Sequence, residues 1–117
     1  MTLVLVADAE ELILRLLQHA LGNLGYEVVS ARNGMVALEL VERLRPAVAV
    51  LDTELPGVDG RHAARLIAQS AHAPRTRVVL LAASADQVGN RTHVDAVLQK
   101  PFRLEELAER IRALCAE

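Results

Sequence analysis

Residues 48–60 read Val48-Ala49-Val50-Leu51-Asp52-Thr53-Glu54-Leu55-Pro56-Gly57-Val58-Asp59-Gly60, and the rest of the sequence is organised around them. Four apolar residues run directly into the carboxylate of Asp52, and a turn rich in proline and glycine follows. A short apolar run bounded by turn signals is typical of a buried strand in a parallel sheet. Ligands of open α/β sheets bind beyond the carboxyl ends of strands, so Asp52 stands where chemistry is expected. Taken alone, it is more simply an ordinary acidic residue at the start of a loop.

Apolar runs and helical spacing alternate along the whole chain. Four further runs predict strands at 3–7, 26–30, 78–83 and 94–98. Between and after the strands, apolar residues at helical spacing predict five helices, of which the third ends at Ala73-Pro74 and the fourth, near Ser84, is kept short by Gly89 and Asn90. The predicted inward stripe of the first helix consists of Leu12, Ile13, Leu16, Leu17, Ala20, Leu21 and Leu24. This alternation predicts right-handed crossovers and a parallel sheet covered on both faces.

Length and composition narrow the class of protein. A chain of 117 residues is expected to form one domain, residues 1–117. No apolar run is long enough for a membrane span and no targeting segment is visible, so we expect no membrane association. The single cysteine, Cys115, fits a cytoplasmic location. A net charge of -2 with interspersed signs, one Tyr and one Phe argue against direct binding of nucleic acid.

Three charged side chains follow strands of the predicted sheet. Asp8 follows the first strand, Asp52 the third and Lys100 the fifth. The carboxyl ends of parallel strands meet at one edge, so two carboxylates and one ammonium group are expected to converge there. Carboxylate oxygens suit Mg²⁺, a lysine neutralises phosphoryl charge, and a carboxylate can act as a covalent nucleophile.

These motifs resemble the receiver domain of two-component response regulators, from Leu3 through the last helix. The motifs that carry the resemblance are Leu5-Val6-Ala7-Asp8, Leu51-Asp52 with Leu55-Pro56-Gly57-Val58-Asp59-Gly60, Lys100-Pro101-Phe102, and the segments 25–28 and 31–38. The resemblance implies a flavodoxin-like (CheY-like) doubly wound α/β fold, with a five-stranded parallel sheet in the order 2-1-3-4-5 and five helices. It further implies a regulatory domain that at most catalyses its own phosphorylation and dephosphorylation.

The resemblance also implies a role for each site residue. Asp52 would be the phosphoacceptor, and Asp8 would share the Mg²⁺ site with it. The backbone carbonyl of Glu54 would be a further metal ligand, and Lys100 would contact the phosphoryl group. The Lys100-Pro101 bond is implied to be cis, an isomer that costs little before proline. The implied donor is a histidine kinase or a phosphotransfer protein.

The sequence departs from the family at the metal site. Receivers usually carry two adjacent acids after the first strand, and here the second position is Ala9. We therefore expect weakened Mg²⁺ binding. Either Glu10 or Glu54 could supply a substitute oxygen, with Glu54 the better placed, and a role for both as solvated surface charges is about equally favoured.

Two further departures affect the family's switch. Ala82 replaces the usual Thr or Ser at the end of the fourth strand, where Ser84 is a partial substitute, and Val97 replaces the usual aromatic residue, whose swing valine cannot reproduce. Lys100 follows Ala82 by only 18 positions, about one helical turn fewer than usual. Because the hydroxyl and the aromatic ring are both missing, the usual coupling between phosphate and surface cannot operate in its usual form.

Two functions remain open from the sequence. In the first, the domain is a phosphorylation switch, which is favoured by Asp8, Asp52 and Lys100. In the second, it is a degenerate pseudo-receiver that binds proteins without phosphorylation, which is favoured by the degenerate switch positions Ala9, Ala82 and Val97. A small flavodoxin-like enzyme is a remote third. We expect no effector domain within this chain, which is either a single-domain regulator or part of a longer protein, and its further partners are an effector domain or a second copy.

Overall fold

The computed structural model describes residues 1–70, 75–89 and 93–116. Five strands form one parallel sheet in the order β2-β1-β3-β4-β5, as predicted. The strands are β1 (Leu3–Ala7), β2 (Glu27–Ala31), β3 (Val48–Asp52), β4 (Arg77–Ala82) and β5 (Ala96–Gln99). All of β3 is buried because it lies at the centre of the sheet with a helical layer on each face.

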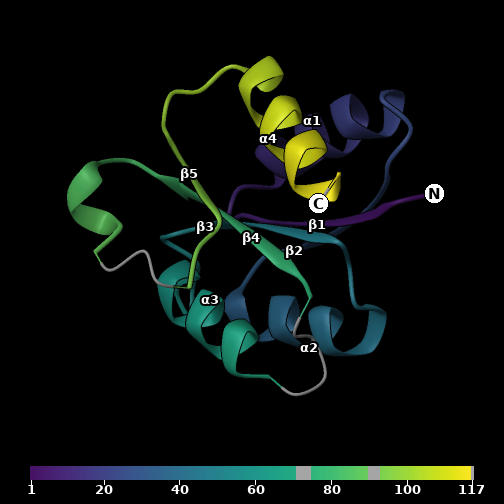
Figure 1. Cartoon of the computed structure of the whole chain (residues 1–117). Coiled ribbons are helices and arrows are strands. Elements are labelled where there is room, and N and C mark those ends of the chain that lie inside the picture. The colour runs from purple at the N-terminus through teal and green to yellow at the C-terminus, as the bar shows by residue number, and fades with distance from the viewer. Residues whose placement is uncertain (71–74, 90–92, 117) are drawn as a thin grey trace.

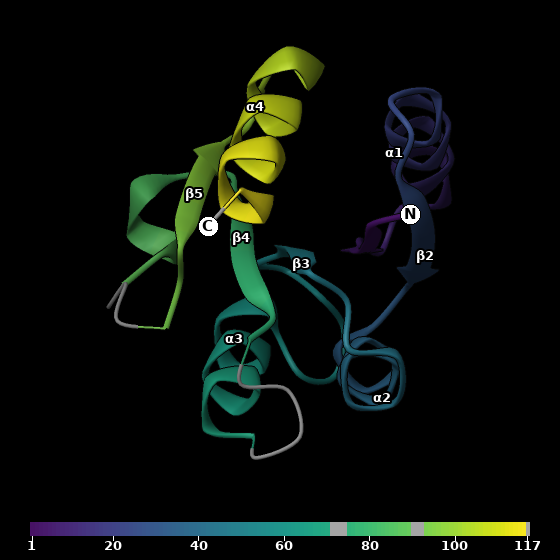
Figure 2. The same cartoon turned by 45° about the vertical axis from the view of Figure 1, so that its right-hand side comes forward.

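Two pairs of helices cover the sheet. The helices α1 (Glu11–Asn23) and α4 (Leu104–Cys115) lie on one face, and α2 (Gly34–Leu44) and α3 (Gly60–Gln69) lie on the other (Figures 1 and 2). Alternate side chains of β3 enter the two cores: Val48 and Val50 pack with α1 and α4, whereas Ala49 and Leu51 pack with α2 and α3. The sheet therefore has a hydrophobic core on both faces, as its near-continuous apolar strands require.

The expected five helices are a miscount for the part of the chain that the structure describes. Within residues 75–89 and 93–116 the connection from β4 to β5 contains only a 3₁₀ turn, η1 (Ala85–Gln87). Gly89 follows with a positive φ of 59°, a conformation that ends helical progression. Asn90 and the predicted end of the third helix at Ala73-Pro74 lie outside the described residues.

The predicted apolar stripe of α1 is wider than the face that the helix buries. Leu17 and Leu21 are buried, but the exposed fractions of Leu12, Leu16 and Leu24 are 77%, 51% and 61%. Apolar residues occupy nearly every turn of this helix, so periodicity alone cannot select the ones that face the sheet. Across the described ranges, no helix is long and apolar enough to span a bilayer.

Candidate functional site

The carboxyl edge of the sheet brings Asp8, Asp52 and Lys100 together. Asp8 directly follows β1 and Asp52 is the last residue of β3, with exposed fractions of 1% and 6%. Lys100 follows β5, and its backbone N–H donates to the Ala82 carbonyl at the end of β4, at 2.8 Å. Its Nζ donates to Oδ2 of Asp52 and lies 3.6 Å from Oδ2 of Asp8. The convergence expected from parallel topology is therefore present.

Both carboxylates are oriented in the same way by the backbone two residues later. The Glu10 N–H donates to Oδ1 of Asp8, and the Glu54 N–H donates to Oδ1 of Asp52, each at 2.9 Å. Such local bonds fix the rotamer of an aspartate at the start of a turn. The Oδ2 atoms are left for Lys100, and that of Asp8 is buried with no hydrogen-bond partner among the described residues.

The pKa values of the three groups respond to this arrangement in opposite directions. Burial raises the pKa of Asp8, and the adjacent Asp52 carboxyl adds to the effect. Burial alone would also raise the pKa of Asp52, but hydrogen bonds from Lys100 and the Glu54 N–H outweigh it and hold this pKa below its ordinary value. Burial opposes the charge of Lys100, yet the two carboxylates raise its pKa. At neutral pH Asp52 and Lys100 therefore form a charged pair.

Two glycines fix the loop that follows Asp52. The Gly60 N–H donates to the Thr53 carbonyl at 3.1 Å, and a Cβ on Gly60 would stand 2.2 Å from the Asp52 carbonyl oxygen. At the other end of the loop, the Gly34 N–H donates to the Pro56 carbonyl at 3.2 Å. A Cβ on Gly34 would stand 1.8 Å from a backbone oxygen of this loop. The first turns of α2 and α3 thus clamp residues 53–59.

Sequence reasoning missed a polar bridge beside Asp52. The side chain of Gln87 bonds the hydroxyl of Thr53, the backbone N–H of Ala83 and the carboxylate of Glu54. No spacing pattern distinguishes Gln87 from other polar residues of its segment. The nearest signal was the connection between β4 and β5, whose short length indicates a path that differs from the family's usual one.

The structure places the three positions at which the sequence departs from the family pattern. Ala82 is buried at the end of β4, and Val97 is half-buried against the core on the α2 and α3 face. Ala9 is half-buried, and its carbonyl accepts a bond from Arg32 at 3.3 Å. The Lys100-Pro101 bond is cis, as expected.

The donor set fits a hard divalent cation. Asp8 and Asp52 present carboxylate oxygens to one place, and the buried Oδ2 of Asp8 has no hydrogen bond to satisfy it. Mg²⁺ often takes one or two carboxylates and keeps several waters. The described residues hold no cluster of three or more His, Cys, Asp or Glu. The carboxylate of Glu54 is engaged by Gln87 at 2.6 Å, and Glu10 is exposed.

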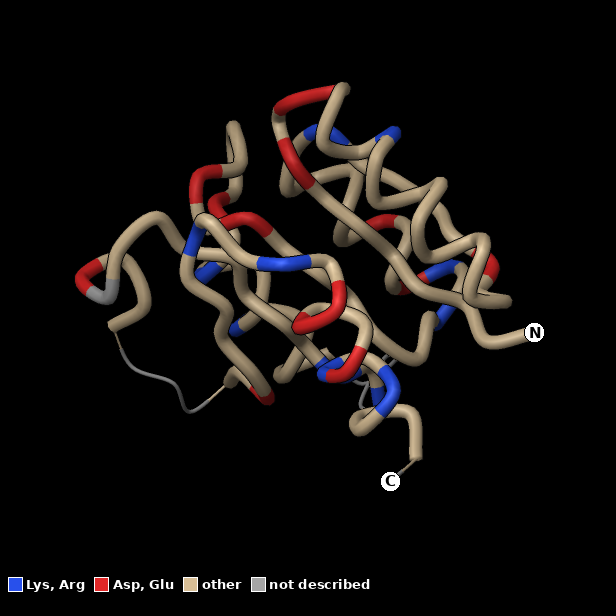
Figure 3. Tube along the Cα trace, turned by 90° about the horizontal axis from the view of Figure 1, so that it is seen from above, with Lys and Arg blue, Asp and Glu red and all other residues tan. Residues whose placement is uncertain are grey.

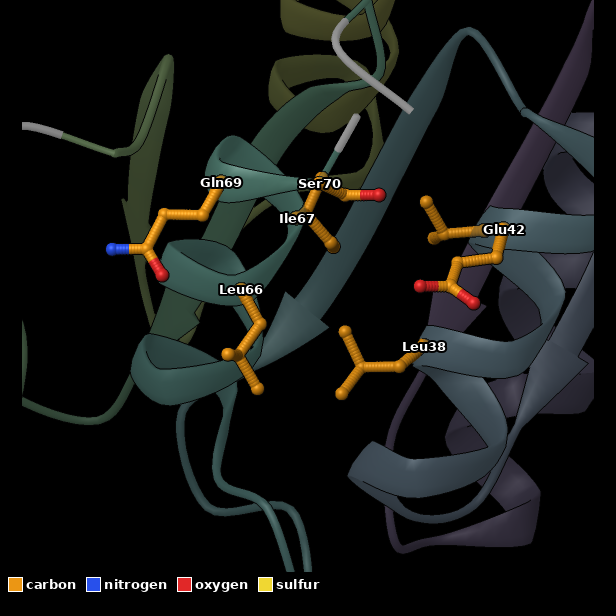
Figure 4. Close-up of a pocket in the computed structure, with 7 residues that line it drawn as sticks. Leu38, Glu42, Leu66, Ile67, Gln69 and Ser70 are labelled. Atoms are coloured by element: carbon orange, nitrogen blue, oxygen red, sulfur yellow. The ribbon is translucent and has the colours of Figure 1, made fainter. Parts of the chain in front are cut away.

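The described surface carries mixed charges and a groove that is separate from this site. Lys and Arg are interspersed with Asp and Glu along the trace (Figure 3), and no basic stripe is visible in that view. A groove of about 520 Å³ lies between α2 and α3, where Leu38 and Leu66 point toward each other (Figure 4). None of the residues that line this groove belongs to the carboxylate and lysine cluster.

Known proteins are similar to this chain in sequence and in fold. The sequence model of the response regulator receiver domain matches residues 4–112. The response regulator MprA of Mycobacterium leprae is 35% identical over 116 residues, which is 95% of this chain and 50% of that protein. The probable transcriptional regulator ycf27 of Cyanophora paradoxa is also 35% identical, with 95% and 47% covered. This chain therefore spans about half the length of these curated relatives.

Solved structures of response regulators have the same fold as this chain. The response regulator TrrA of Thermotoga maritima, in complex with Mg²⁺ and BeF, is 30% identical and superposes with a TM-score of 0.88, covering 97% of this chain and 99% of that one. The receiver domain of the Francisella response regulator 1452 is 28% identical with a TM-score of 0.90, covering 99% and 98%.

Proposed function

This chain belongs to the response regulator receiver domain family, and from that premise we propose that Asp52 is its phosphoacceptor. The donor would be a histidine kinase or a phosphotransfer protein of a two-component pathway. The domain is then a regulatory switch whose own carboxylate is modified, and it acts on no separate substrate. The observation that carries this proposal is the placement of Asp52 at the end of β3, with Lys100 on one carboxylate oxygen and the Glu54 N–H on the other.

This geometry supports an in-line phosphoryl transfer. A carboxylate oxygen of Asp52 attacks phosphorus and forms the acyl phosphate bond, while the bond from phosphorus to the donor histidine nitrogen breaks and that nitrogen keeps the electron pair. The Glu54 N–H holds the carboxylate in place for the attack. Lys100 is placed to neutralise charge on the phosphoryl oxygens as they approach two carboxylates.

Asp8, Asp52 and the backbone carbonyl of Glu54 are the residues that would hold Mg²⁺. When bound, this ion supplies additional neutralisation of the phosphoryl charge. Ala9 removes one carboxylate from the usual set, so we propose that this site binds Mg²⁺ more weakly than a receiver with two adjacent acids.

The alternative is a pseudo-receiver that binds partners without being phosphorylated. It is favoured by Ala82, which is buried at the end of β4 and has no hydroxyl to offer a phosphoryl group. Val97 likewise has no aromatic ring to move. Asp8, Asp52 and Lys100 favour phosphorylation instead, because a module without phosphate chemistry gains little from burying two carboxylates beside one lysine.

The wider setting follows from the family. The matched region is about half of each curated relative, and ycf27 is named a probable transcriptional regulator, so an effector domain or a second copy is a proposed partner. The proposed location is the cytoplasm, where kinase and effector meet.

Intact-mass spectrometry after incubation with acetyl phosphate and Mg²⁺ tests the proposal. We expect an adduct of about 80 Da on the parent protein, and its loss in Asp52→Asn. Asp59→Asn is the matched control, because an asparagine still accepts the His62 N–H at the start of α3 and the adduct should persist. A folded parent protein that gains no mass, with no change on Mg²⁺ titration, would instead establish the pseudo-receiver.

A further inference from the structure

The side chain of Gln87 joins two loops at the carboxyl edge of the sheet. Its Oε1 accepts two hydrogen bonds, from the Thr53 hydroxyl at 2.9 Å and from the Ala83 N–H at 2.8 Å. Its Nε2 donates to the Glu54 carboxylate at 2.6 Å. One amide group therefore connects the loop after β3 with the loop after β4.

Gln87 itself is held from three directions. Its N–H donates to the Ser84 carbonyl at 3.2 Å, which closes the turn η1. Its carbonyl accepts a bond from Arg61 of α3 at 3.0 Å. The next residue, Val88, is buried with 2% of its surface exposed. The side-chain amide of Gln87 therefore projects from a backbone that these contacts hold in place.

The segment that Gln87 holds is the one that orients the proposed phosphoacceptor. The Glu54 N–H donates to Oδ1 of Asp52, and the carbonyl of Glu54 is the proposed backbone ligand for Mg²⁺. Ala82 has no hydroxyl with which to link the ends of β3 and β4. The only side-chain link between Thr53 or Glu54 and the β4 loop that the described structure records is the Gln87 amide.

We propose that Gln87 is a positioning residue of the phosphoacceptor site. It fixes Thr53 and Glu54 so that the Glu54 N–H stays on Asp52 and the Glu54 carbonyl stays available to a cation, and it keeps the Glu54 carboxylate engaged outside the cation site. This role rests on the proposed function. In it, a side chain of the 3₁₀ turn connects the loop after β3 with the loop after β4.

Two substitutions separate the components of the bridge. Gln87→Ala removes all three bonds. Gln87→Glu keeps both acceptor bonds but sets a carboxylate against that of Glu54, which should drive the two residues apart because like charges repel. Adding Glu54→Gln to Gln87→Glu restores a donor and acceptor pair with its direction reversed. Gln69→Ala is the matched control, since Gln69 is the last residue of α3 and takes no part in the three bonds of the Gln87 amide.

Titration with Mg²⁺ alone, followed by amide NMR, is the first measurement. Loss of residues that orient metal ligands typically weakens metal binding by about 10-fold to 100-fold. We expect Gln87→Ala and Gln87→Glu to weaken Mg²⁺ binding by about 10-fold, and the double variant to recover most of the loss. Initial rates of Asp52 phosphorylation by acetyl phosphate should follow the same order. Gln69→Ala should match the parent protein in both measurements.

The amide proton shift of Glu54 gives a readout that needs neither metal nor phosphate. Its hydrogen bond to Asp52 should weaken in both single variants and return in the double variant. Folded single variants with an unchanged Glu54 shift and unchanged Mg²⁺ affinity would overturn the inference, as would a double variant without recovery. If the parent protein gains no phosphoryl group, the proposed function fails, and the Glu54 shift still decides whether Gln87 positions this segment.

Discussion

The ammonium group of Lys100 lies 3.6 Å from Oδ2 of Asp8, a buried oxygen that accepts no hydrogen bond within the described residues. The same ammonium group donates to Asp52. One cation therefore serves two buried carboxyl groups, and burial disfavours the ionised form of Asp8. A site of this kind is destabilised in the free protein and is ready to attract a cation or to react.

Asp8→Asn should stabilise the metal-free protein at pH 7. Burial raises the pKa of Asp8 above its ordinary value of 3.8, so holding this group ionised costs folding free energy at neutral pH. An amide of the same shape avoids that cost, and we expect a gain on the order of 1 kcal/mol in urea unfolding.

The pH dependence checks the cause of that gain. A carboxyl whose pKa is raised by folding binds its proton more tightly in the folded state, so its cost vanishes below pH 3.8 and grows as the pH rises through the folded value. The advantage of Asp8→Asn should therefore disappear in acid. An equal advantage at every pH would point to packing, and a loss of stability at pH 7 would show that Asp8 is favourable as a charge.

Lys100→Met should have the opposite effect on stability. It removes the cation that lowers the pKa of Asp52, leaving two carboxylates together at the edge of the sheet. The Lys100 side chain is 32% exposed, so we expect a loss of about 1 kcal/mol at pH 7, below the value for fully buried pairs. Thermal or urea unfolding measures it.

The sign of the pH effect again follows from the pKa directions. The lowered pKa of Asp52 gives stability that is present above 3.8 and is lost as pH falls through the folded value. The raised pKa of Lys100 gives stability that is present below 10.5 and is lost as pH rises through its folded value. The difference between parent and Lys100→Met should thus be largest between about pH 5 and pH 10. A constant difference in acid would contradict the pairing with Asp52.

The fold follows from sequence where the local pattern and the global arrangement agree. Val48–Asp52 is apolar at every position before its carboxylate, and a central strand of a parallel sheet requires that pattern. The predicted fourth helix, near Ser84, is replaced within the described residues by a single 3₁₀ turn, because Gly89 has a positive φ and the connection to β5 is short. The leucines of α1 show the other limit, since periodicity does not reveal how narrow a face the sheet will cover.

The candidate site likewise has a part that could be predicted from the sequence and a part that could not. Parallel topology alone brings the ends of β1, β3 and β5 to one edge, so the meeting of Asp8, Asp52 and Lys100 could be predicted. The bridge from Gln87 could not, because it depends on the path of the loop after β4. That path is set by the Arg61 contact and the burial of Val88, and neither follows a sequence period.

Leu17→Ala and Leu16→Ala test the corrected face of α1. Leu17 is buried with 1% of its surface exposed, whereas Leu16, its neighbour in the chain, is 51% exposed. We expect Leu17→Ala to cost about 2–4 kcal/mol through lost burial and a cavity, and Leu16→Ala to stay within about 0.5 kcal/mol of the parent. Urea unfolding of both variants measures the contrast. Equal losses would mean that Leu16 is covered in solution.

Two glycine substitutions test the clamp on the loop after Asp52. In Gly60→Ala the new Cβ would stand 2.2 Å from the Asp52 carbonyl oxygen, and in Gly34→Ala it would stand 1.8 Å from the Val58 carbonyl oxygen. Both neighbours are backbone atoms, so the loop or the helix must move. We expect each substitution to cost about 2–3 kcal/mol by urea unfolding, in the range for overpacking.

Gly22→Ala is the matched control, because its Cβ would meet nothing within 4 Å and the residue lies within α1. There the better helix propensity of alanine should stabilise the protein by about 0.5–1 kcal/mol. The loop that Gly60 and Gly34 hold also carries the Glu54 N–H bonded to Asp52. Gly60→Ala should therefore slow phosphorylation of the protein that remains folded, while Gly22→Ala should not. A Gly60→Ala protein with parental stability would show that the first turn of α3 does not clamp the loop after Asp52.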